Sequence, residues 1–229
     1  MAQEVKQNKF YIVFEGSDFC GKGTQIEMLR QMPLFNAAYF VREPTGIFRA
    51  ILKQNEEESK DLLTPFGLEV AQNINKTPEF YFHSMISQRL SLFNSDQFKK
   101  NQLVISDRGH LSTYSYQCVA QKLDGIYESL WNEIYKELFI NIHDLWIFID
   151  ISEDTFKERK SITTNRPPDE FDDSTLNFFH AIRKGYNRLE SYIDMNGGRF
   201  IRVDGNRDPE QIHRDIMVAI RDFLPKEFY

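Results

Sequence analysis

A glycine-rich turn near the N-terminus carries the first residues whose types and spacing could do chemistry. Gly16 and the pair Gly21-Lys22 have the spacing G-x-x-x-x-G-K of a phosphate-binding loop. Glycines allow a tight turn whose backbone N–H groups converge on phosphate oxygens, and the helix that follows adds its positive N-terminal end. The mobile charge of Lys22 can reach the β- and γ-phosphates. The loop therefore predicts an ATP site, formed by Gly16, Ser17, Asp18, Phe19, Cys20, Gly21, Lys22, Gly23 and Thr24.

The loop departs from the strict pattern directly after its lysine. Gly23 stands where Ser or Thr is usual, and the hydroxyl comes one residue later, at Thr24. This order resembles adenylate kinases, and it implies that Mg²⁺ is held mainly through water and the nucleotide, with Thr24 nearer the α-phosphate. The alternative is a chance glycine-rich turn, which the position between an apolar strand and a helix disfavours.

A second candidate site is the pair Asp107-Arg108, which ends another apolar segment. A carboxylate at the end of a buried strand beside a phosphate-binding loop can organise Mg²⁺ and its waters, so Asp107 is the predicted metal ligand. The planar fork of Arg108 suits a substrate phosphate, because it can bind two oxygens at once. A simple ion pair at a strand end is the alternative interpretation.

These residues need a scaffold, and the apolar pattern predicts an open α/β sheet. Short, nearly continuous apolar segments are typical of parallel strands buried on both faces, and helical patterns lie between them. We expect a five-stranded, mostly parallel sheet with helices on both faces, as in P-loop NTPases. The predicted strands are Phe10–Phe14, Tyr39–Arg42, Leu103–Ser106, Leu145–Ile151 and Phe200–Val203. The predicted helices are Gly23–Gln31, Thr77–Asn94, Ser112–Gln121, Tyr127–Phe139, Glu153–Lys160, Thr175–Asp194 and Pro209–Phe223.

Two polar stretches interrupt the alternation of strands and helices. Gln54–Asp61 is acidic and is interpreted as a surface connector. Ser161–Asp173 contains two prolines between two helices, and it is where a phosphoryl-transfer enzyme would carry a lid. We expect one domain over residues 1–229, with the lid at about 159–173.

Composition limits the possible functions. The chain has 229 residues, is 41% apolar and carries a net charge of −6, which disfavours a general nucleic-acid binder. Two cysteines form no disulfide framework and the five histidines have no metal-site spacing. Neither a signal peptide nor an apolar run of roughly 18 residues is present, so we expect a cytoplasmic protein without membrane contact.

The ordered motifs of the chain resemble thymidylate kinases over almost the whole length. The phosphate loop, the triplet Arg42-Glu43-Pro44 and the segment Asp107–Gln117 match family motifs in the family order. Ile147–Glu153 matches a strand-to-helix motif, and Ile201–Asn206 matches the adenine loop. The resemblance implies transfer of a phosphoryl group from ATP to dTMP with Mg²⁺, in dTTP synthesis, by a protein that is usually a homodimer.

The resemblance also implies roles for individual residues of the acceptor site. Asp18 would lie near the sugar or acceptor phosphate, Arg42 and Pro44 would shape the acceptor site, and Arg108 would bind the monophosphate. Arg89 would read the exposed oxygen of thymine. Thr113 would face the base edge and Tyr116 would pack beneath the deoxyribose, although Tyr116 could instead be a core residue of an amphipathic helix.

The chain departs from the family pattern in the base pocket and in the lid. Met85 stands where a phenylalanine usually stacks on thymine, and Tyr81 or Phe82 could substitute only if the helix shifts. The family's lid arginine is replaced by Glu170, and the lid is slightly longer than in bacterial relatives. The phosphate loop has no arginine, so a catalytic cation is expected from the lid region. Arg166 is the first candidate there and Arg159 the second, with Lys157 and Lys160 nearby.

Two other functions stay open at the level of the sequence. One is a kinase for dUMP, for another 5-substituted deoxyuridylate or for a deoxynucleoside, for which Glu15 is not decisive as a base. The other is a non-catalytic module that binds nucleotide as a switch. Cys20 is given no role, because phosphoryl transfer needs no covalent thiol.

Overall fold

The computed structural model describes residues 9–43, 77–123, 125–139, 142–162 and 176–228. Its centre is a five-stranded sheet in the order β2-β3-β1-β4-β5, in which every neighbouring pair is parallel. The predicted open sheet is thus confirmed, and none of the strands in the described ranges is antiparallel. The strands are β1 (Lys9–Glu15), β2 (Tyr39–Arg42), β3 (Leu103–Asp107), β4 (Ile142–Asp150) and β5 (Arg199–Asp204).

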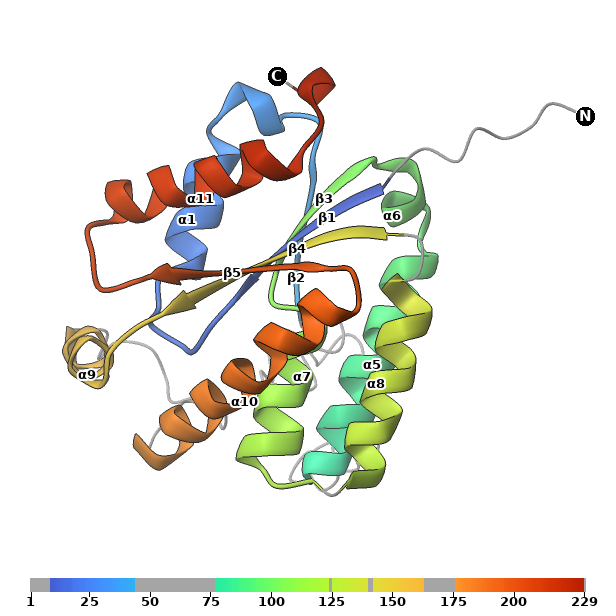
Figure 1. Ribbon diagram of the computed structural model, residues 1–229, viewed down its shortest axis with the longest axis vertical. Helices are drawn as coiled ribbons and strands as arrows, with labels where there is room; N and C mark the ends of the chain where they lie inside the picture. Colours follow the sequence, from blue (N-terminus) through green and yellow to red (C-terminus); the bar gives the residue numbers. More distant parts are fainter. Residues whose placement is uncertain (1–8, 44–76, 124, 140–141, 163–175, 229) are drawn as a thin grey trace, which may run out of the picture.

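Helices cover both faces of the sheet, because its central strand is apolar on both sides (Figure 1). Phe10, Ile12 and Phe14 of β1 pack on one side, against α1 (Lys22–Arg30) and α11 (Pro209–Phe223). Tyr11 and Val13 point to the other side. That side is covered by α5 (Pro78–Asn94), α8 (Gly125–Phe139) and α10 (Leu176–Met195). Alternate side chains of a strand point to opposite faces, so both faces of β1 are buried in apolar clusters.

The strand register gathers the predicted phosphate-binding residues at one edge. Phe14 of β1 lies opposite Asp107 of β3, and Glu15 lies opposite Phe148 of β4. The loop that leaves β1 and the pair Asp107-Arg108 are therefore adjacent in space. Ligands of open parallel sheets bind at this carboxyl edge, close to where the strand order reverses.

One predicted helix has a different form from the one expected. In place of a regular helix over Ser112–Gln121, the chain forms a short α7 (His110–Thr113) followed by a π-helix, η2 (Tyr114–Ala120). The wider winding is accompanied by a very close approach to α10. A Cβ on Gly185 would lie 2.7 Å from Cα of Ser115, so only glycine fits there.

Other elements differ from the prediction mainly at their ends. The helix α6 (Asp96–Lys100) was not predicted; it begins after Ser95, whose hydroxyl accepts a bond from the Phe98 N–H at 3.2 Å. The helix α9 (Glu153–Ile162) extends two residues into the predicted loop Ser161–Asp173. Short turns η1 (Pro33–Phe35) and η3 (Lys226–Phe228) complete the described elements.

Some sequence predictions fall on residues outside the described ranges. These are Pro44, Gln54–Asp61, Arg166, Glu170 and most of the lid. No helix in the described ranges combines the length and the apolar character that a membrane span requires.

Candidate active site

The phosphate-binding loop spans residues 16–21 between β1 and α1, and its backbone adopts the unusual angles that such a loop needs. Gly16 has φ 143° and Gly21 has φ 97°, both in the region that favours glycine. A Cβ on Gly16 would lie 2.7 Å from the Ile149 carbonyl oxygen, which excludes any larger residue. Phe19 adopts φ 62° without being glycine, and its ring packs edge-on against Phe156 of α9 at 5.7 Å. The helix α9 thus supports the loop from outside.

The ammonium group of Lys22 lies inside this loop. Lys22 is 7% exposed, and its Nζ donates to the carbonyl oxygens of Gly16 and Ser17 at 2.9 and 2.7 Å. It also approaches the buried thiol of Cys20 at 3.4 Å. A charge held by backbone carbonyls at the first helical turn is placed to meet phosphate oxygens.

Arg159 links α9 to two other walls of the site. Its Nη1 donates to the Phe19 and Cys20 carbonyl oxygens at 3.2 and 3.3 Å, and its Nη2 donates to the Gly205 carbonyl oxygen at 2.8 Å. Gly205 follows β5 and belongs to the segment matched to the adenine loop. The second lid candidate is therefore in direct contact with the phosphate-binding loop.

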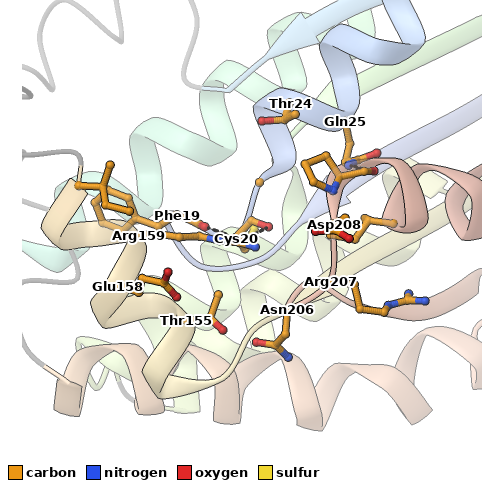
Figure 2. Close-up of a pocket in the computed structure, with 14 residues that line it drawn as sticks. Phe19, Cys20, Thr24, Gln25, Thr155, Glu158, Arg159, Asn206, Arg207 and Asp208 are labelled. Carbon is orange, nitrogen blue, oxygen red and sulfur yellow. Dashed lines mark hydrogen bonds between the residues drawn. The ribbon is translucent and has the colours of Figure 1, made fainter.

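These walls enclose a pocket of about 630 Å³. Figure 2 shows Thr24 of α1 at the top, Phe19 and Cys20 beside Arg159 of α9, Thr155 below them, and the loop after β5 toward the right. That loop is tied to the start of α9, because Asn206 Oδ1 accepts the Ser152 N–H at 2.8 Å. The remaining lining residues are Gly21, Gln25, Glu158, Ile162, Asn206, Arg207, Asp208, Pro209 and Ile212.

Arg108 is held at the adjoining edge in a strained conformation. Its φ is 70°, outside the usual range for a residue with a side chain, and its N–H donates to the Phe14 carbonyl oxygen at 2.9 Å. The guanidinium donates to Asp18 Oδ1 at 2.5 Å and to the Gly16 carbonyl oxygen at 3.2 Å. It also lies over the Tyr116 ring at 4.8 Å. Strain of this kind persists where function requires a fixed position.

Asp107 has one carboxylate oxygen in an ion pair and one without a protein partner. Arg42 Nε lies 3.4 Å from Asp107 Oδ2, whereas Oδ1 is buried and lacks a hydrogen bond to any described residue. A buried carboxylate oxygen beside a phosphate loop suits Mg²⁺, which commonly takes one or two carboxylates together with substrate phosphates and water. No group of three acidic, histidine or cysteine side chains gathers as a complete metal site in the described ranges.

Glu15 is completely buried beneath Arg108. Its carboxylate accepts the Ser112 N–H at 3.1 Å, the Ser112 hydroxyl at 2.5 Å and the Tyr186 hydroxyl at 2.9 Å. Burial raises the pKa of Glu15, while these hydrogen bonds oppose the increase. The Ser112 hydroxyl also lies 3.4 Å from Arg108 Nη1, so Glu15 acts on the arginine through Ser112.

Arg89 of α5 lies at the centre of a buried polar network. The residue is 1% exposed and forms a two-pronged ion pair with Glu43, through Nε at 3.2 Å and through Nη2. Its Nη1 lies 2.9 Å from His110 Nδ1 and 3.3 Å from the Thr113 hydroxyl. Glu43 is itself fixed, because its N–H donates to the Asp107 carbonyl oxygen at 2.9 Å.

Comparison with known proteins identifies the family. The sequence model of the family described as thymidylate kinase matches residues 14–216. The chain belongs to the thymidylate kinase family. A thymidylate kinase of Caldanaerobacter subterraneus subsp. tengcongensis is 30% identical over 224 residues, covering 93% of this chain and 96% of that protein. One of Chlorobium limicola is 28% identical over 225 residues, covering 93% and 95%.

A solved structure supports the same fold. The crystal structure of the thymidylate kinase from Ehrlichia chaffeensis covers 93% of this chain and 99% of its own, with a TM-score of 0.59 and 21% sequence identity. Membership of the thymidylate kinase family makes this chain an enzyme, a kinase of the transferase class that binds nucleotides.

The structure brings together most of the predicted site residues of this thymidylate kinase family member. The loop residues, Asp107, Arg108 and Arg42 share one edge, whereas Arg89 and Thr113 meet in the buried network. Met85 is half-buried on α5, one turn before Arg89. Phe82 is fully buried against Tyr127 of α8 at 5.1 Å, so a shift of the helix to use Phe82 would break the core.

Sequence reasoning missed the partners that hold these residues. Glu43 was seen only as part of a motif, His110 only as a residue without metal spacing, and Glu15 only as an undecided base. Glu43 could have been found, because a carboxylate directly after a buried strand usually has a cationic partner. Nothing in the sequence indicates that His110 faces Arg89, because the contact depends on how α7 packs against α5.

Proposed function

We propose that this thymidylate kinase family member transfers the γ-phosphoryl group of ATP to dTMP and gives dTDP. The observation that carries the proposal is the strand register that sets Lys22 and Arg108 at one edge of the sheet. Lys22 lies within the loop whose residues Phe19, Cys20 and Gly21 line a pocket of about 630 Å³, and Arg108 lies at the adjoining edge. ATP would occupy the pocket of Figure 2, with its base toward the loop after β5.

The chemistry needs positioning and positive charge more than a strong base. The acceptor phosphate is largely ionised at neutral pH and can attack the γ-phosphorus in line. Lys22 would neutralise the transferring group, and Arg108, fixed by Asp18 and by Ser112, would hold the acceptor phosphate. Arg166 would add a charge from the lid, with Arg159 as the alternative donor.

The residues at the sheet edge also fit Mg²⁺. Asp107 would hold the ion through Oδ1 and water, while Arg42 keeps the other carboxylate oxygen in place. When bound, Mg²⁺ supplies charge to the phosphate oxygens and orients them. The loop hydroxyl of Thr24 would lie nearer the α-phosphate.

Recognition of the acceptor nucleoside is assigned to α5, α7 and η2. Arg89 would donate to the base oxygen and Thr113 would face the base edge, with Met85 packing on the ring. Tyr116 would lie beneath the deoxyribose and crowd a 2′-hydroxyl. A deoxynucleoside acceptor is disfavoured, because it needs a free carboxylate base and Glu15 is buried in bonds to Ser112 and Tyr186.

We also propose a cytoplasmic homodimer that packs through α5 and α8. These helices lie side by side on one face of the sheet (Figure 1) and carry exposed apolar side chains. Leu90 is 41% exposed, Ile126 75% and Leu130 39%. Light scattering should give twice the chain mass of 27.1 kDa, and a charged residue at Leu130 should lower it.

An ADP-release assay tests the proposed acceptor. It compares dTMP, dUMP, dGMP, dCMP, dAMP and AMP at equal concentration, with Lys22→Ala as the control for contaminating kinases. We expect turnover with dTMP, less with dUMP and little with the others. Turnover with purine monophosphates alone would contradict the proposal. ATP binding without turnover of any monophosphate would favour a nucleotide-binding module.

A further inference from the structure

The guanidinium of Arg89 is almost fully committed to protein partners. An arginine has five N–H groups. One goes to each oxygen of Glu43, one to His110 and one to Thr113. Among the contacts with described residues, the N–H that remains is on Nη2. Four contacts thus fix the direction of this fifth N–H, which is the donor that a ligand would use.

The neighbours of His110 fix its protonation state. His110 Nε2 lies 2.9 Å from the Trp131 carbonyl oxygen, which can only accept a hydrogen bond, so Nε2 carries the proton. Nδ1 faces Arg89 Nη1 at 2.9 Å, and a guanidinium nitrogen can only donate, so Nδ1 must be an unprotonated acceptor. The two contacts together select the neutral ring with its proton on Nε2. Burial and the Arg89 charge lower the pKa of His110 well below its ordinary value, in agreement with this assignment.

The imidazole ring is also held mechanically. It stacks on Trp131 of α8, with ring centroids 4.7 Å apart, and on Tyr135 at 5.8 Å. The Trp131 indole N–H donates to the His110 carbonyl oxygen at 2.8 Å. The ring and the backbone of His110 are therefore fixed by α8, and its tautomer is fixed by α8 and Arg89 together.

We propose that His110 is a specificity-determining positioning residue, which holds Arg89 so that the remaining Nη2 N–H meets a carbonyl oxygen of the acceptor base. The proposal rests on the function proposed above. Glu43 fixes one edge of the guanidinium, and His110 fixes the other. Without the His110 contact, the Nη1 side of the guanidinium keeps, among the described residues, only the longer contact with Thr113, at 3.3 Å, and its remaining donor loses direction.

The chemical consequence is selection at position 4 of a pyrimidine. Thymine and uracil present an acceptor oxygen there, whereas cytosine presents an amino group that would face the Arg89 donor. A rigid donor rejects a facing donor because both groups would be desolvated and unpaired. A donor that can pivot away rejects it less.

Three variants separate this role from a structural one. His110→Phe keeps the stack on Trp131 and removes the acceptor for Arg89. His110→Asn restores an oxygen close to the position of Nδ1. His143→Phe is the matched control, because His143 is exposed at the start of β4 and stacks on Phe10 outside the site. Steady-state kinetics for dTMP, dCMP and ATP are measured for all three.

We expect His110→Phe to lower kcat/KM for dTMP about tenfold, mainly through KM, with little change for dCMP or for the KM of ATP. The ratio of dTMP to dCMP efficiency then falls about tenfold, and His110→Asn recovers most of it. Equal losses for dTMP and dCMP, or an Asn variant no better than the Phe variant, would overturn the proposal. If the Phe variant does not fold, the Asn variant decides alone, since a tenfold loss of its ratio contradicts the proposed role.

A spectroscopic measurement is independent of turnover. The ¹⁵N shifts of His110 in the wild-type enzyme should report the neutral ring with its proton on Nε2 between pH 6 and 8. A charged ring or a proton on Nδ1 would overturn the proposal even in an active enzyme. By contrast, a wild-type protein that does not phosphorylate dTMP would contradict the proposed function, whatever state His110 shows.

Discussion

Replacement of Arg159 by alanine should weaken ATP binding much more than it slows the chemical step. The side chain donates to the carbonyl oxygens of Phe19, Cys20 and Gly205, and so joins the phosphate-binding loop to the loop after β5. A hydrogen bond from a charged donor contributes about 1.5–3 kcal/mol when buried. Arg159 is only half-buried, so water can satisfy the three carbonyls after the change. We therefore expect a total loss of about 2 kcal/mol, or about a 30-fold increase in the KM for ATP.

The measurement is steady-state kinetics with ATP and dTMP varied in turn. The KM for dTMP and kcat should change less than about threefold, because the contacts of Arg159 lie on the pocket proposed to bind ATP. Arg159→Lys should recover only part of the loss, since an ammonium cannot span the three carbonyls. Arg214→Ala, an exposed change on α11, is the control. A large fall in kcat with an unchanged KM for ATP would refute this reasoning and would make Arg159, not Arg166, the catalytic cation.

Three further predictions address the other parts of the site. Lys22→Ala should lower kcat about 10³-fold or more without unfolding the protein. ADP release measures kcat, and circular dichroism measures the fold. A variant that keeps a tenth of normal kcat would show that the loop is not the donor site. Met85→Phe should increase the preference for dTMP over dUMP by about 1 kcal/mol, or about fivefold in the ratio of kcat/KM. An unchanged ratio would show that Met85 does not make the base pocket more tolerant of dUMP. The last prediction concerns pH. The pKa of His110 is lowered in the folded state, so the unfolded chain binds more protons below its ordinary value of 6.5, and wild-type stability falls as pH falls from there. Denaturant unfolding should show His110→Asn losing less stability than wild type, by up to about 1.4 kcal/mol for each pH unit below 6.5. Equal slopes would mean that His110 is charged in the fold. The raised pKa of Glu15 works in the opposite direction, but it is common to both proteins and cancels in the comparison.

The scaffold could be predicted because each strand is a short apolar segment. The loops that form the site could be predicted because the strands before them are followed by the glycine-rich motif or by Asp107-Arg108. The segment from Phe10 to Phe14 is continuously apolar, which predicts a parallel strand buried on both faces, and the structure buries all five residues. Asp107 could be placed beside the phosphate loop because the carboxyl ends of parallel strands meet at one edge.

The supporting network could not be predicted, because its members come from different segments. Arg89 and Glu43 are 46 residues apart, and Arg89 and His110 are 21 apart. Their meeting depends on how α5 and α7 settle on the sheet, and periodicity carries no information about that. The π-helix was missed for a similar reason. Its side chains have the apolar pattern of an ordinary helix, whereas its distinguishing feature is the wider backbone winding, which residue types do not show.

The winding of η2 also affects how related chains can be compared. A π-helical turn takes in about one residue more than an α-helical turn, and each residue of an α-helix advances by about 100° around the axis. Deleting one residue between Thr113 and Tyr116 would restore the tighter winding and turn the Tyr116 ring away from Arg108. A gap of a single position in an alignment of this segment therefore changes which side chain lies against Arg108, even when every flanking motif is unchanged. Residues 114–120 are best aligned first by their contacts with α10 and Arg108, and only then by sequence identity.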